Sequence, residues 1–120
     1  MPDLKNLLTG IPPAGPQEHL QTLLETRELR IERIVSHGQT SPEGFWYDQP
    51  TAEWVLLVSG RARLRFEDGR VMDLSPGSFV NVSAHERHHV DWTDPDQPTV
   101  WLAIHYREGQ VAGNEHQFRP

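Results

Sequence analysis

The 120 residues suffice for one domain with a hydrophobic core and leave no room for a second domain. The absence of cysteine excludes disulfides, thiolate metal sites and cysteine nucleophiles, so any metal would need nitrogen and oxygen ligands. Eleven basic residues against 17 acidic ones give a formal charge of -6. This balance argues against a nucleic acid or an anionic membrane surface as partner, and it favours a small molecule.

Two further absences in the sequence bear on location and cofactor. The longest apolar run covers residues 54–58, whereas a membrane-spanning helix needs roughly 20 apolar residues. The first residues lack the basic and apolar stretches of a secretory signal, and no glycine-rich phosphate loop follows. We therefore expect a cytoplasmic protein with no nucleotide cofactor.

Residues 1–30 are expected to form an N-terminal arm and a short helix that pack on the rest of the domain. Residues 4–15 show little periodicity and contain prolines, which is typical of an extended arm. A proline follows Gly15, and then Leu20, Leu23 and Leu24 recur at the spacing of one helix face. The pattern predicts a helix over residues 16–25.

From residue 28 onward the apolar period changes to two, and short segments rich in β-formers alternate with turns. Ser59-Gly60 and Asp68-Gly69 suit tight hairpins because glycine tolerates positive φ. The pattern predicts an all-β barrel or sandwich over residues 31–107 and a C-terminal tail over 108–120. The predicted strands cover residues 29–36, 54–58, 62–67, 71–74, 78–82, 88–92 and 100–106.

Two spaced motifs lie within this β region. Glu53 stands seven residues before the hairpin glycine Gly60, which matches the second half of the first cupin motif, G-x5-H-x-H-x3,4-E-x6-G. Downstream, Gly77-x5-Ser83-x-His85-x2-His88-x3-Trp92 can be laid on the second motif, G-x5-P-x-G-x2-H-x3-N. Over roughly residues 31–106 the chain resembles a small single-domain bacterial cupin.

The resemblance implies a cupin jelly-roll barrel, an antiparallel double-stranded β-helix, whose cavity is lined by alternate strand residues. It also implies a divalent transition metal (Zn, Mn, Fe, Ni or Cu) in that cavity. Small cupins commonly pair, so a homodimer is expected as well.

The sequence departs from the cupin pattern at several ligand positions. The two histidines of the first motif align with Tyr47 and Gln49, or with Trp46 and Asp48. In the second motif the ligand histidine is kept as His88, while His85 stands in the place of the glycine. The usual set of three histidines and one glutamate is therefore incomplete.

We expect Glu53 and His88 to be the first two metal ligands, because they match motif positions that supply a carboxylate and an imidazole. Gln49 is a weaker third candidate, with Asp48 and His85 as alternates. Tyr47 is a candidate catalytic acid or hydrogen-bond donor. The residues expected to line the pocket are Trp46, Tyr47, Trp54, Trp92 and His105.

His105 is interpreted as a partly buried, hydrogen-bonded residue in preference to a ligand, since it shares a strand side with Trp101 and Ala103. Two function hypotheses follow. One is a metal-dependent oxygenase, isomerase or decarboxylase acting on a small polar molecule. The other is a barrel that binds or senses a small molecule without catalysis and without a tight metal, and loss of both first-motif histidines favours it.

Overall fold

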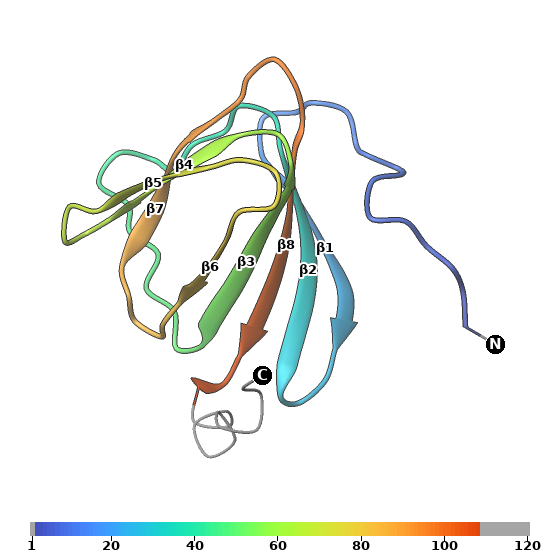
Figure 1. The fold of residues 1–120 in the computed structure, drawn as a ribbon, viewed down its shortest axis with the longest axis horizontal. Coiled ribbons are helices and arrows are strands. Elements are labelled where there is room, and N and C mark those ends of the chain that lie inside the picture. Colours follow the sequence, from blue (N-terminus) through green and yellow to red (C-terminus); the bar gives the residue numbers. More distant parts are fainter. Residues whose placement is uncertain (1, 109–120) are drawn as a thin grey trace.

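A computed structural model describes residues 2–108 as eight strands in two antiparallel sheets that face each other (Figure 1). The five-stranded sheet has the order β1-β2-β8-β3-β6 and the three-stranded sheet the order β5-β4-β7. Apart from Glu108, the predicted C-terminal tail lies outside the described residues. The strands are β1 (His19–Glu25), β2 (Leu29–Ser36), β3 (Ala52–Ser59), β4 (Ala62–Phe66), β5 (Val71–Leu74), β6 (Phe79–Val82), β7 (His88–Thr93) and β8 (Thr99–Tyr106).

The all-β architecture predicted from the sequence is confirmed, and the seven predicted strands match β2 to β8 with end differences of one or two residues. In residues 2–108 the structure contains no helix long and apolar enough to cross a membrane.

The predicted helix over residues 16–25 is wrong, because residues 19–25 form strand β1. β1 pairs with the free edge of β2, and Leu20 lies opposite Ile34. A ten-residue amphipathic helix is marginal on its own, whereas the edge of β2 offers a row of unpaired backbone groups. A bulge between Thr22 and Leu24 interrupts the alternation of β1, which is why its leucines could mimic a helical spacing.

The N-terminal arm is held by hydrogen bonds to its backbone carbonyls from Arg33, His37 and Gln39. The Arg33 guanidinium donates hydrogen bonds to the carbonyls of Leu7 (3.1 Å), Thr9 (2.7 Å) and Gly10 (3.2 Å). Arg33 itself is almost fully buried. Leu4, nearer the end of the arm, is fully exposed, and the arm runs away from the sheets there (Figure 1).

The core lies between the two sheets at one end of the barrel. Alternate residues of β3, β4 and β8 point inward, as the period-two pattern requires. Trp101 is the largest of these side chains, and it is buried together with smaller apolar ones. The buried cluster consists of Val55, Leu57, Ala62, Leu64, Phe66, Leu74, Val82, Trp101 and Ala103.

The hairpin between β3 and β4 brings its glycine against β8. Gly60 has a φ of +92°, and a Cβ added there would lie 2.6 Å from the Cα of Thr99. Thr99 is fully buried, and its hydroxyl donates to the carbonyl of Arg61 at 3.2 Å. Gly60 therefore meets both a backbone and a packing requirement that only glycine satisfies.

Gly69, in the β4–β5 hairpin, is a matched control because its φ is +98° and an added Cβ would meet nothing within 4 Å. We expect Gly69→Ala to lose about 1–2 kcal/mol of stability through backbone strain alone. Gly60→Ala should lose about 1–3 kcal/mol more, because Thr99 must move. Urea denaturation of both variants measures the difference, and equal losses would contradict the close packing of Gly60 on β8.

Candidate functional site

A cavity of about 220 Å³ lies between the two sheets, next to the core. Since one water takes about 30 Å³ of liquid volume, there is room for a small molecule and not for a polymer segment. Its lining is drawn from both sheets and from the segments before β1 and β3. The lining residues are Glu18, Leu20, Arg30, Glu32, Ile34, Tyr47, Gln49, Glu53, Val55, Leu64, Val82, His88, Val90, Trp101 and His105.

Glu53 and His88 face each other across this cavity from opposite sheets. Glu53 lies in β3 and His88 begins β7, and the distance from Glu53 Oε1 to His88 Nε2 is 3.9 Å. Both side chains are buried, with 13% and 8% of their surface exposed. At 3.9 Å the two groups are too far apart for a hydrogen bond, and a ligand atom can approach both.

The orientation of His88 is set by its other ring nitrogen. Nδ1 lies 2.9 Å from the carbonyl oxygen of Glu86, which can only accept, so Nδ1 carries the proton. In the neutral ring Nε2 then presents a lone pair to the cavity. Among residues 2–108 no hydrogen bond is made by this Nε2 or by the Glu53 carboxyl, so both are free to meet a ligand.

A second histidine lies on the other side of Glu53. β3 and β8 pair so that Glu53 stands opposite His105, whose Nε2 is 2.8 Å from Glu32 Oε1. Burial raises the pKa of Glu53, while the nearby His105 and His88 partly oppose that rise. The net effect favours the protonated carboxyl, which can donate a proton.

Tyr47 and Gln49, which align with the missing motif histidines, both reach the cavity. The Tyr47 N–H donates to the carbonyl of His88 at 2.7 Å, and the His88 N–H donates back to Tyr47 at 3.2 Å. The two rings stack with centroids 5.4 Å apart. Burial raises the pKa of Tyr47, as do the charges of Glu18 and Glu53, so the phenol stays a hydrogen-bond donor at neutral pH.

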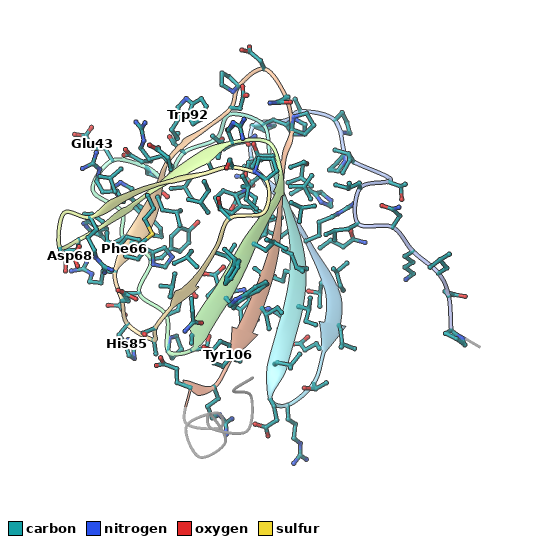
Figure 2. All side chains as sticks on the ribbon, in the orientation of Figure 1. Glu43, Phe66, Asp68, His85, Trp92 and Tyr106 are labelled. Carbon is teal, nitrogen blue, oxygen red and sulfur yellow. The ribbon has the colours of Figure 1, made fainter. Side chains whose placement is uncertain are left out.

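The alternates Asp48 and His85 meet each other outside the cavity. His85 Nδ1 lies 2.7 Å from Asp48 Oδ1, and the two side chains are 68% and 46% exposed. His85 has a φ of +62°, the left-handed conformation that suits the glycine of the motif. Figure 2 shows His85 in the loop at the lower rim of the barrel. The structure therefore brings these two residues together, away from Glu53.

Three tryptophans predicted to line the pocket are not among the residues that line this cavity. Trp46 stacks on His89, with centroids 4.4 Å apart. Trp54 packs on Phe79 on the outer face of the five-stranded sheet, because Glu53 beside it points inward. Trp92 lies opposite Arg63, and a bulge one residue earlier turns it outward while Thr93 is buried in its place.

Three charged residues of the cavity were missed from the sequence: Glu18, Arg30 and Glu32. The alternation of β2 could have found the latter two, since they share a side with Ile34 at spacings of two residues. Glu18 could not have been found while its segment was expected to be helical.

The donor set does not fit the usual cupin metal site. Within residues 2–108 no three histidine, aspartate or glutamate side chains are placed to hold one metal ion. At the two substituted positions, the cavity receives a phenol from Tyr47 and an amide from Gln49, and both are weaker ligands for transition metals than imidazole. The metal expected from the motif therefore stays a prediction.

Comparisons with known proteins agree with this fold. The cupin domain family matches residues 32–105. A structure from Ralstonia eutropha JMP134, described as a "putative mannose-6-phosphate isomerase", is 48% identical, with a TM-score of 0.85 over 88% of this chain and 99% of that one. The search of curated proteins found no match.

More distant structures share the fold alone. A cupin superfamily protein from Desulfitobacterium hafniense DCB-2 is 18% identical, with a TM-score of 0.67 over 81% of this chain and 84% of that one. The polyketide cyclase RemF from Streptomyces resistomycificus is 14% identical, with a TM-score of 0.65 over 76% and 66%.

The raised pKa of Glu53 predicts how stability depends on pH. Because the folded state disfavours the carboxylate, the free energy of unfolding should fall as pH rises above the ordinary glutamate value of about 4.3. Glu53→Gln removes this cost, so the variant should have the higher Tm at neutral pH and an equal Tm near pH 4. Thermal unfolding followed by circular dichroism measures the effect.

The control is Glu43→Gln, since Glu43 is exposed and lies at the periphery of the barrel (Figure 2). Its Tm should track that of the original protein at every pH. A Glu53→Gln variant that is less stable at neutral pH would mean that a cation holds the carboxylate in its charged form.

Proposed function

We propose that this chain, which belongs to the cupin family, binds a small polar carbonyl compound in its barrel and catalyses proton transfer on it. The observation that carries the proposal is the buried Glu53–His88 pair, 3.9 Å apart and without hydrogen bonds to the described residues. A buried carboxyl that can donate a proton, placed beside an imidazole nitrogen that can accept one, is a usual arrangement for acid–base catalysis.

The roles follow from the protons that each group holds. His88 Nε2 takes a proton from the carbon next to the carbonyl, while Glu53 gives its proton to the carbonyl oxygen. With an α-hydroxy carbonyl compound the product is an enediol. The protonated His88 then gives its proton to the former carbonyl carbon while Glu53 takes the proton of the other hydroxyl, which completes an isomerisation and restores both groups. Tyr47 can donate a hydrogen bond to a ligand oxygen, and the apolar end of the cavity limits access of water.

The isomerase description of the 48%-identical neighbour supports this reaction class, because interconverting an aldose and a ketose moves protons in this way. His105 and Glu32 support it structurally. Their 2.8 Å contact fixes the ring of His105, which stands opposite Glu53 in the pairing of β3 with β8.

Deuterium incorporation tests the proposal on simple carbonyl compounds, so the natural substrate need not be identified first. In D₂O, small hydroxyaldehydes and hydroxyketones such as glyceraldehyde and dihydroxyacetone should exchange their α-protons faster with the protein present. His88→Gln should lower the catalysed rate by about 10²–10⁴-fold, the usual contribution of a general base. NMR of the carbonyl compounds measures the exchange.

His89→Gln is the matched control, because His89 stacks on Trp46 outside the cavity, and its rate should stay unchanged. Equal rates for the original protein and His88→Gln with every compound would refute catalysis by this pair. The barrel would then be a module that binds without turnover.

The incomplete donor set predicts that freshly purified protein contains less than stoichiometric transition metal. Elemental analysis of the protein, His88→Ala and His89→Ala provides the measurement. A stoichiometric metal that is lost in His88→Ala and kept in His89→Ala would show that His88 is a ligand, as the motif suggests.

A further inference from the structure

Three carboxylates line the cavity, and their surroundings differ. Glu32 is compensated, with Arg30 Nε at 3.5 Å and His105 Nε2 at 2.8 Å. Glu53 has the imidazole of His88 at 3.9 Å, while His105 and Arg30 act on it from further away and lower its pKa. Glu18 has no ion-pair partner among the described residues, and Arg30 is the only arginine or lysine among the cavity-lining residues that the structure describes.

Glu18 is held in place by two buried side chains. The Ser36 hydroxyl donates to Glu18 Oε2 at 3.4 Å and accepts from Trp101 Nε1 at 3.1 Å. Ser36 and Trp101 are 1% and 4% exposed, so this chain of hydrogen bonds fixes the carboxyl against the core. Burial raises the pKa of Glu18, the hydrogen bond from Ser36 partly opposes that rise, and the charges of Glu53 and Glu32 add to it, so a cation beside Glu18 would favour its ionised form.

Most of the free polar groups of the cavity are acceptors, although Arg30 Nε is a buried donor without a hydrogen bond to the described residues. The carboxyl of Glu53 offers acceptor oxygens when it is ionised, and Glu18 keeps lone pairs that Ser36 does not use. His88 Nε2, on a side chain more than nine-tenths buried, presents a lone pair with no donor among residues 2–108. Such a cavity is completed by a ligand that donates several hydrogen bonds.

We propose that the ligand of this cavity carries a positive charge, as a protonated amine or a related nitrogen cation, and that Glu18 sets this preference. An ammonium group donates three hydrogen bonds and compensates the carboxylates, whereas a phosphate or carboxylate donates none and adds negative charge. The inference rests on the proposed function, since it assigns a ligand class to the same cavity. A cationic substrate would distinguish this chain from a sugar phosphate isomerase, while the type of reaction would stay the same.

Three probes of nearly equal size and different charge test the ligand class: ethanolammonium, ethylene glycol and glycolate. NMR titrations at about pH 7.5, where free imidazole is neutral, follow the ring resonances of His88 and His105. Ethanolammonium should bind at least about tenfold more tightly than glycolate, with ethylene glycol between them. Glu18→Gln should weaken ethanolammonium binding about tenfold and change ethylene glycol binding by less than about twofold.

Two further variants accompany the titrations. Glu43→Gln, which changes an exposed charge outside the cavity, should leave all three affinities unchanged. Ser36→Ala removes the hydroxyl that orients Glu18 and should weaken ethanolammonium binding by a smaller factor than Glu18→Gln does. Dispersed amide spectra and a cooperative thermal transition establish that the variants are folded.

The outcomes separate the two proposals. Glycolate binding as tightly as ethanolammonium overturns the inferred ligand class while leaving the proposed function intact. An unchanged ethanolammonium affinity in Glu18→Gln overturns the assignment of Glu18. If none of the three probes shifts either histidine, the cavity does not bind small polar molecules and the proposed function itself fails.

Discussion

The antiparallel register of β3 with β8 determines where both the core and the cavity lie. Because Glu53 pairs with His105 and Val55 with Ala103, the same inward row changes from charged to apolar within two residues. A shift of one residue would turn Glu53 outward and Trp54 inward. The buried acid, its histidine neighbours and the apolar end of the cavity all depend on this one alignment.

Much of the fold could be predicted because period-two alternation and turn glycines are local signals. Strands β2 to β8 carry the alternation, and Gly60, Gly69 and Gly77 mark the turns between β3 and β6. Residues 19–25 could not be assigned in this way, since their partner is the edge of β2 and the bulge after Thr22 disguises the alternation. Sequence spacing identified Glu53 and His88 as a pair, and the structure places them 3.9 Å apart. Trp92 was misplaced because a single bulge reverses the direction of a side chain.

The site also shows how a barrel can keep part of a motif while its chemistry changes. Glu53 and His88 keep their positions, but Tyr47 and Gln49 bring a phenol and an amide where the motif has imidazoles. Burial of the Glu53 and Glu18 carboxyls favours their protonated forms. A cavity of this kind is suited to exchanging protons with a ligand.

Strand β1 is paired on one side only. Leu20, in β1, and Glu18, the residue just before β1, both line the cavity. Separating β1 from β2 breaks one ladder and leaves the pairings of β2 with β8 and of β8 with β3 intact. Such partial opening requires less free energy than global unfolding. A small molecule could thus enter and leave when β1 separates locally from β2, and amide hydrogen exchange in β1 should then be faster than in the central strands β2, β8 and β3.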